Sequence, residues 1–247
     1  MPKRVQFPYD DRLAALVSRD VSSIADVVEV LQKLDGVLDG TEDGLKWFNS
    51  LYLEVTLAVR ERVVSGAFDS PQGTTFIAAL DAVFASFYFT ALRNWFACVS
   101  APASWRVLFA ERSNRSLARI QFALAGVNAH INRDLAPAIA RTCKQGNLTP
   151  AHATAEYRAY TVLNDTLDDL INQAKRDLMV RLPGDLLPHA AEVEMAVGAW
   201  GIRASRESAW IHAEVLYQVG GEPLLTERLM GALDHAAALA GNALLIL

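Results

Sequence analysis

The stretch IQFALAGVNAHINRDL (120–135) decides the fold, because its apolar residues recur with the period of an α-helix. The main apolar stripe is formed by Ile120, Leu124, Val127, Ile131 and Leu135. Between them lie the small residues Ala123, Ala125, Gly126 and Ala129, which would let neighbouring backbones approach closely. The stretch therefore predicts a long helix against which other helices pack tightly.

The same periodicity extends along the chain, whereas the alternating pattern of β-strands and the Asn-Gly and Asp-Gly turns of hairpins are missing. Thr41, Ser70-Pro71 and Thr149-Pro150 have the residue types that begin helices. We expect one all-α domain over residues 1–247, a bundle of about seven or eight helices. The predicted helices span 22–35, 42–66, 72–98, 103–111, 115–145, 150–181, 189–219 and 223–246.

Composition excludes several classes of protein. The chain has 247 residues, of which 52% are hydrophobic and 21% charged, as expected for a globular domain with a sizeable core. A net charge of −5 gives no basic surface for nucleic acid. Cys98 and Cys143 lie far apart in sequence and have no metal-binding spacing, which favours a reducing cytoplasm. No secretory signal and no run of about 20 apolar residues is apparent, so we expect no membrane partner.

Polar residues that periodicity places near the interior are the candidates for function, because buried polar groups are costly unless they have partners. His130 and Asp134 lie four residues apart on one flank of the central stripe, and Asn128 and Asn132 lie on the other. Such a His–Asp pair can bind one metal ion, or the carboxylate can orient the imidazole. A simple hydrogen bond is the alternative interpretation.

Other helices carry similar candidates. Asp81 falls on the edge of an apolar stripe, where it would need a basic partner, a helix to cap or a metal ion. His152 and Glu156 repeat the four-residue spacing with Glu156 facing inward, although His152 can equally belong to a frayed helix end. Arg203 and Glu207 lie between two apolar stripes that contain tryptophans, so we expect them to be partly buried, either as a structural ion pair or as a clamp for a substrate anion.

Five segments together resemble a bacterial family known as domain of unknown function 5995. The likeness covers roughly residues 25–215, and LAGVNAHINRDL is its most specific part. The family name implies a single helical domain and no activity. The segments are FNSLYLEVT (48–56), ALDAVFASFYFTAL (79–92), APASWRVLF (101–109), IQFALAGVNAHINRDL (120–135) and AWGIRASRESAW (199–210).

The paired His-x-x-x-Asp and His-x-x-x-Glu motifs are also similar to those of the zinc-dependent phospholipase C and nuclease fold, whose members are all-α enzymes. That resemblance implies that one or two divalent ions are bound by Asp81, His130, Asp134, His152 and Glu156. The run Gly-Asp-x-His-Gln-Pro-Leu-His and an N-terminal Trp, which supply further ligands in that fold, are missing from this chain.

Three functions remain open, all with a small molecule as partner where there is one. In the first, a divalent ion (Zn²⁺, Mn²⁺ or Mg²⁺) assists hydrolysis, Arg203 holds an anionic group, and Asn128 and Asn132 orient the substrate. In the second, a metal-free cyclase or isomerase of a biosynthetic pathway moves protons with His130, Asp134 or Glu156. Its substrate is apolar and lies among aromatic residues. In the third, the polar residues form only a structural network. The aromatic candidates are Phe84, Tyr88, Trp95, Trp200 and Trp210.

Overall fold

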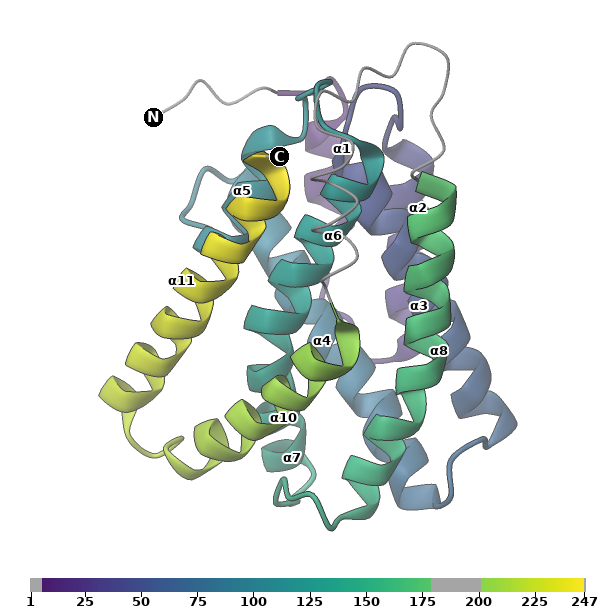
Figure 1. Ribbon diagram of the computed structural model, residues 1–247, viewed down its shortest axis with the longest axis vertical. Helices are drawn as coiled ribbons and strands as arrows, with labels where there is room; N and C mark the ends of the chain where they lie inside the picture. The colour runs from purple at the N-terminus through teal and green to yellow at the C-terminus, as the bar shows by residue number, and fades with distance from the viewer. Residues whose placement is uncertain (1–5, 179–200, 247) are drawn as a thin grey trace.

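The computed structural model describes residues 6–178 and 201–246, and these contain helices and no strand. The predicted all-α class is therefore confirmed, and the helices form a single compact arrangement (Figure 1). They are α1 (Asp10–Leu16), α2 (Ile24–Val37), α3 (Leu45–Ser65), α4 (Pro71–Phe96), α5 (Ala103–Glu111), α6 (Arg119–Ala129), the π-helix η1 (His130–Leu135), α7 (Ala136–Gln145), α8 (Ala155–Leu178), α10 (Ile202–Gln218) and α11 (Pro223–Ile246).

The successive helices α6, η1 and α7 form the centre of the bundle (Figure 1). Helix α6 contacts α3, α5, α8 and α11, and η1 and α7 contact α4 and α10. Every residue from Ile120 to Ala129 is buried, and a helix that is buried on all sides belongs to the core. The segment that predicted the fold is thus the one around which the other helices pack.

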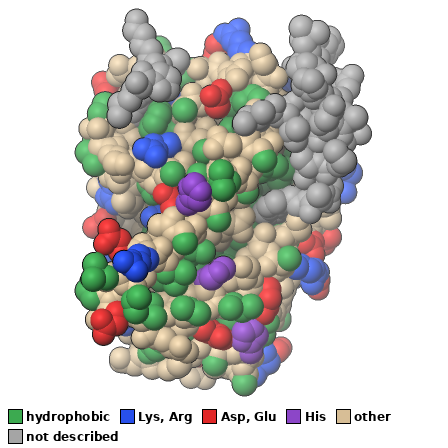
Figure 2. Space-filling view, turned by 60° about the vertical axis from the view of Figure 1, so that its left-hand side comes forward, with side chains coloured by type: hydrophobic (Ala, Val, Ile, Leu, Met, Phe, Trp, Pro, Cys, Tyr) green, Lys and Arg blue, Asp and Glu red, His purple; other side chains and the backbone are tan. Residues whose placement is uncertain are grey.

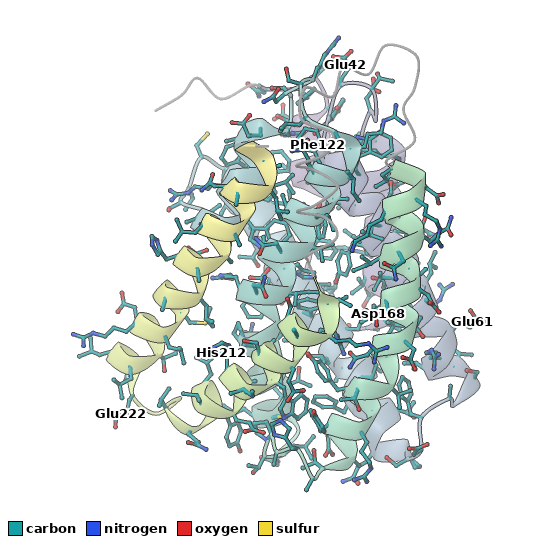
Figure 3. The ribbon with its side chains drawn as sticks, viewed as in Figure 1. Glu42, Glu61, Phe122, Asp168, His212 and Glu222 are labelled. Carbon is teal, nitrogen blue, oxygen red and sulfur yellow. The ribbon has the colours of Figure 1, made fainter. Side chains whose placement is uncertain are left out.

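Small residues set the distance between α3 and α6. A Cβ atom on Gly126 would lie 2.3 Å from the ring of Phe48, and a Cβ atom on Gly44 would lie 2.4 Å from the ring of Phe122. Phe122 lies at the end of α6 that faces the turn containing Glu42 (Figure 3). The predicted close approach of backbones at Gly126 is therefore confirmed.

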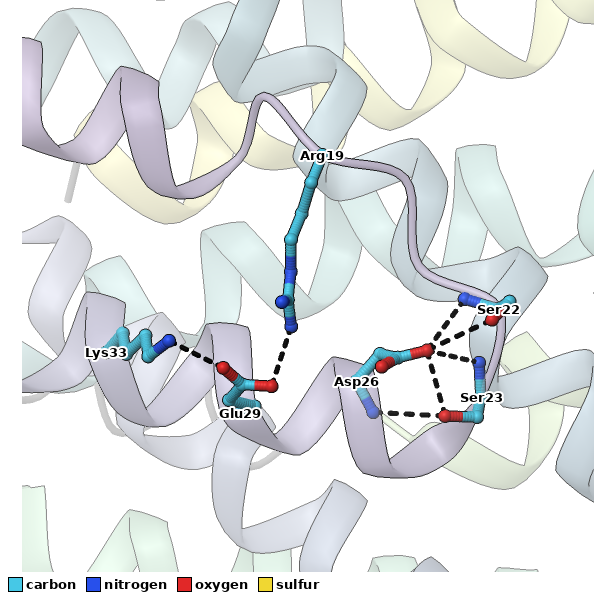
Figure 4. A network of polar contacts seen from close by, with 6 residues as sticks. All are labelled: Arg19, Ser22, Ser23, Asp26, Glu29 and Lys33. Carbon is cyan, nitrogen blue, oxygen red and sulfur yellow. Dashed lines mark hydrogen bonds and ion pairs between the residues drawn. The ribbon is translucent and has the colours of Figure 1, made fainter.

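Side chains at the first turns explain where helices begin. Ser70 accepts a hydrogen bond from the backbone N–H of Gly73 at 3.0 Å, so α4 begins at Pro71 as its sequence predicts. At α2, the Ser23 hydroxyl accepts from the Asp26 N–H, and the Asp26 carboxylate accepts from the Ser23 N–H (Figure 4). This reciprocal pair satisfies two amides that have no partner within the helix.

The predicted starts of two helices are wrong because other side chains accept the first free amides. Asp43, rather than Thr41, accepts from the first backbone N–H of α3 at 3.0 Å. Thr154, rather than Thr149, accepts from a first-turn N–H of α8 at 3.2 Å. Helix α8 is consequently shorter than predicted at its N-terminal end.

Three further boundaries differ from the sequence prediction. Helix α1 was missed, and the helix expected over 115–145 is interrupted by the π-helical turns of η1. Part of the helix expected over 189–219, including Trp200, lies outside the described residues, and its described part begins at Ile202.

Arg112 ties α1 and the turn before α3 to the end of α5. Its guanidinium is buried and forms ion pairs with Asp10 at 2.9 Å and with Asp43. Its backbone carbonyl accepts from the Gly44 N–H at 2.6 Å. Because two carboxylates face one buried cation, the loss of the cation would leave buried charges without compensation.

Helix α4 contains an 18-residue stretch with a mean hydropathy of 1.6, which is long and apolar enough to cross a membrane by length and composition. The expectation of no membrane partner stays a prediction, because length and composition alone do not decide it. Half of the stretch is buried among the other helices, and core helices of soluble proteins pass the same test.

The outer surface mixes side chains of every kind. On the side that α11 forms in Figure 1, apolar side chains alternate with charged ones and histidines (Figure 2). Apolar side chains scattered in this way are ordinary at a protein surface. The polar groups that need an explanation lie in the interior.

Candidate functional site

An apolar, partly open cavity of about 90 Å³ lies between α3, α4, α6, η1, α8 and α10. A buried water needs roughly 10–15 Å³ on this scale, so the cavity has room for several waters or a small ligand. Most of its wall consists of aliphatic and phenylalanine side chains. The polar or ionisable side chains in the wall are Tyr52, Asp81, His130, Tyr160 and Arg206.

Three of these side chains have a buried polar atom that makes no hydrogen bond within the described part of the chain. They are the hydroxyl of Tyr52, Oδ2 of Asp81 and Nε2 of His130. Few buried polar groups in native proteins lack a partner, and each one calls for an explanation. Three such atoms around one cavity are the feature expected of a site that binds a polar group of a ligand.

Asp134 and Phe84 hold His130 in place. Its Nδ1 lies 3.3 Å from Oδ2 of Asp134, and its ring stacks on Phe84 with centroids 3.5 Å apart. Asp134 is fully buried and also accepts from Trp105 Nε1 at 2.8 Å and from Arg133 at 2.5 Å. Because a carboxylate only accepts, we assign the ring proton to Nδ1, which leaves Nε2 with a free lone pair.

The predicted contact between His130 and Asp134 is therefore confirmed. Both residues lie in the π-helix η1, which ends just before Pro137. Proline has no backbone N–H and its ring crowds the preceding turn, so an α-helical hydrogen bond cannot form there. Single π-helical turns of this kind are frequent at functional sites.

Burial determines the protonation states of Asp81 and His130 in the cavity wall. Burial raises the pKa of Asp81 to about 8, so its carboxyl group is mostly protonated at neutral pH. Burial also lowers the pKa of His130, and this effect outweighs the opposing influence of Asp134. The cavity thus contains a neutral acid and a neutral base at the same pH.

Arg206 is a cavity residue that the sequence analysis missed. It is 6% exposed and stacks on the ring of Tyr160, with 3.8 Å between the guanidinium carbon and the ring centroid. It lies four residues after Ile202 and four before Trp210, so it is part of the same helical stripe as these two apolar residues. An arginine in the middle of that stripe was the signal that could have revealed it.

The second predicted motif does not reach the cavity. Glu156 is buried near Cys143, where its charge adds to the effect of burial and raises the pKa of the thiol to about 12. His152 lies at the surface before α8 begins, and its two ring nitrogens each lie 2.8 Å from a carboxylate, those of Glu207 and Glu214. The prediction that His152 and Glu156 face inward together is wrong for His152, because residues 146–154 do not continue the helix.

The predicted substrate-binding residues lie elsewhere. Asn128 donates to the carbonyl of Ala237 on α11 at 2.7 Å, and Asn132 donates to Asn128 at 2.8 Å. Their amides therefore link α6 and η1 to α11. Tyr88 and Trp210 are buried, and Trp95 is partly buried against Phe109, but none of these three lines the cavity.

Arg203 and Glu207 do not pair with each other. Arg203 has a side chain that is 54% exposed and binds Asp165 and Asp168 on α8, so its expected burial is wrong. Figure 3 shows Asp168 on α8 beside α10. Glu207 accepts from Tyr157 at 2.7 Å and faces His152. These contacts dock α10 on α8 and on the turn before it.

The five predicted metal ligands fall into separate places. Asp81 and His130 line the cavity, Asp134 lies behind His130, and Glu156 and His152 lie outside it. Within the described residues no group of three His, Cys, Asp or Glu side chains has the arrangement of a metal site. The residues therefore do not fit the metal cluster that the zinc-enzyme resemblance implies.

Comparison with known proteins shows the family and nothing about activity. No curated protein and no solved structure matches the chain, so the likeness to the zinc-dependent phospholipase C and nuclease fold has no support there. Residues 24–246 match a family described as a family of unknown function, DUF5995. Because this match covers most of the length, the chain belongs to the DUF5995 family.

Proposed function

We propose that this protein is a metal-free enzyme that binds a small, largely apolar molecule in the interior cavity and catalyses a proton-transfer reaction such as an isomerisation. The observation that carries the proposal is the pair formed by Asp81 and His130. Both side chains line one apolar cavity, each has a buried atom without a partner, and burial shifts their pKa values in opposite directions. Acid and base roles are commonly separated by environments of this kind.

The chemistry assigned to each group follows from its protonation state. Nε2 of His130 accepts a proton from a C–H bond of the substrate, and the electron pair of that bond moves into the substrate. The protonated carboxyl of Asp81 gives its proton to the atom that receives the electrons. His130 then releases its proton to water, and Asp81 takes up a proton from water, which restores both groups to their starting states.

The surroundings of His130 suit the formation of an imidazolium. Asp134 faces Nδ1 and stabilises the positive charge, as a carboxylate does behind a catalytic histidine. Trp105 and Arg133 hold that carboxylate by hydrogen bonds, which fixes its orientation. The stacked ring of Phe84 restricts rotation of the imidazole. Tyr52 offers a further hydroxyl to an oxygen of the substrate.

Exchange of substrate hydrogen for solvent deuterium tests the proposal directly. Cyclopentanone and cyclohex-2-enone, which are small ketones with acidic C–H bonds, are incubated with the protein in D₂O and followed by proton NMR. We expect protein-dependent exchange that His130→Ala and Asp81→Asn each reduce by at least about 100-fold, the usual range for loss of a general acid or base. His235→Ala, which changes an exposed histidine on α11, is the matched control and keeps the wild-type rate.

The alternative functions give different results in the same experiment. Metal-dependent hydrolysis predicts about one equivalent of zinc or manganese in protein purified without chelator, lost in His130→Ala. A structural network predicts no exchange with any probe and only changes in stability. Either result, in wild-type protein of native circular dichroism, would replace the proposal.

A further inference from the structure

Among the described residues, Arg206 has no carboxylate partner, unlike Arg112, the other buried arginine, and Arg203 of α10. Arg112 faces Asp10 and Asp43, and Arg203 faces two aspartates of α8. Arg206 donates instead to the side-chain oxygen of Asn164 at 2.8 Å and to the backbone carbonyl of Tyr160 at 2.7 Å. Among the described residues its charge is therefore held by neutral groups.

A buried cation without a counter-ion is costly, because the low dielectric of the interior does not replace its hydration. Asp168 is the acidic side chain that favours the charged form of Arg206, but it binds Arg203 and is partly exposed. Burial outweighs this attraction and lowers the pKa of Arg206. A buried guanidinium whose charge meets only neutral hydrogen-bond partners is a feature expected of an anion-binding site.

Arg206 lines the same cavity as Asp81 and His130. The hydrogen bonds that it makes use Nε and one terminal nitrogen, so the other terminal nitrogen stays available to a ligand. The aliphatic residues Ile202, Leu163 and Leu167 also contribute to the wall. A ligand that satisfies all of these groups has an anionic end and an apolar body.

We infer that the cavity binds a small monoanionic carboxylic acid, with its carboxylate on Arg206 and its apolar body towards Asp81 and His130. This inference rests on the proposed function, because it names the class of its substrate. The remaining terminal nitrogen of the guanidinium can give a carboxylate a charge-assisted hydrogen bond, and arginine keeps its positive charge when buried more readily than lysine does. The volume of about 90 Å³ limits the body to a short chain or one small ring.

Hexanoate and its neutral isostere hexanamide test the inference, since they share a body and differ in charge. Their dissociation constants are measured by isothermal titration calorimetry at pH 7.5. We expect the wild type to bind hexanoate at least about tenfold more tightly, which corresponds to about 1.4 kcal/mol. Arg206→Met removes the preference, so that the ratio approaches one, and Arg206→Lys keeps part of it.

Arg203→Met is the matched control, because it removes an arginine one helical turn away whose ion pairs lie at the surface. The preference for hexanoate remains in this variant. A ratio near one in the wild type overturns the inference, and so does an unchanged ratio in a folded Arg206→Met protein. If Arg206→Met does not fold, the ratio of the two dissociation constants in the wild type still tests the inference.

The two proposals fail in distinguishable ways. In one outcome, a neutral ketone exchanges deuterium in a His130-dependent way while hexanoate and hexanamide bind equally well. This result refutes the inference that the ligand is an anion and supports the proposed proton transfer. Binding of hexanoate that depends on Arg206, without exchange of any probe, refutes the enzyme and leaves a carboxylate-binding protein.

Discussion

Replacing Asp81 by asparagine is expected to stabilise the protein at neutral pH. Asparagine has nearly the same shape as the protonated carboxyl but cannot ionise. The pKa of Asp81 is raised by burial from 3.8 to about 8, so the folded chain binds more protons than the unfolded chain between these values. Stability is then fully present below pH 3.8 and is lost as the pH rises towards 8.

The magnitude follows from the width of that interval. Each pH unit costs about 1.4 kcal/mol, and roughly three units separate 3.8 from 7, so the wild type loses about 4 kcal/mol at pH 7. The residue is only 8% exposed, which leaves little room for screening by solvent. Asp81→Asn therefore gains up to about 4 kcal/mol at pH 7 and little at pH 4.

Urea unfolding between pH 4 and pH 9 measures this difference. The free energy of unfolding of Asp81→Asn minus that of the wild type should rise with pH and level off above about pH 8. Asp169→Asn, at an exposed position of α8, serves as the control with a nearly constant difference. A constant difference for Asp81→Asn would refute the reasoning, because it would mean that Asp81 is ionised and compensated in the folded protein.

Three further substitutions test the packing and the ion pairs. Gly126→Ala should destabilise the protein by about 1–3 kcal/mol because its Cβ meets the ring of Phe48, whereas Gly36→Ala, which meets nothing within 4 Å, should be neutral or stabilising; equal urea midpoints would contradict this. Arg112→Met should cost about 3–5 kcal/mol by leaving two buried carboxylates unpaired, and a loss under about 1 kcal/mol in chemical unfolding would show that they are solvated. His152 donates a hydrogen bond to the carboxylate of Glu207, which raises the pKa of His152, so the stability that this residue adds is present below pH 6.5 and lost as the pH rises. His152→Ala should therefore cost less than about 1 kcal/mol at pH 6 and still less at pH 9, and a larger loss at pH 9 than at pH 6 would contradict this sign.

Helical periodicity predicts the longer helices but not how far they extend, and it misses the short helix α1. The all-α class and the close approach at Gly126 follow from spacing and side-chain size, which are local properties of the sequence. Helix ends depend on which side chain accepts the first free amide. Thr41 and Asp43 both qualify by residue type, and the tertiary contact between Asp43 and Arg112 decides between them.

For the candidate site, too, contacts within one helix could be predicted from the sequence, and contacts between helices could not. His130 and Asp134 were found because both lie on one helix, where the four-residue spacing determines that they meet. Glu156 is buried as predicted, yet it lies outside the cavity, because the direction of a buried face says nothing about which neighbour covers it. Arg206 lies between Ile202 and Trp210 on one face of α10, and these apolar neighbours predict an apolar face that hides the arginine.

The π-helix accounts for one feature that periodicity could not supply. An uninterrupted α-helix through residue 137 would require an N–H that proline lacks, and η1 shifts the hydrogen bonds before it. This insertion rotates the side chains of η1 relative to those of α6 and contributes His130, Ile131 and Leu135 to one cavity wall. Pro137→Ala supplies the missing donor, so it should favour a regular helix and change the environment of His130. The position of the His130 ring would then depend on Pro137, a residue that does not touch the cavity. A helical wheel assumes a fixed rotation of about 100° per residue. It can therefore predict that His130 and Asp134 are neighbours, but not that His130 faces the cavity.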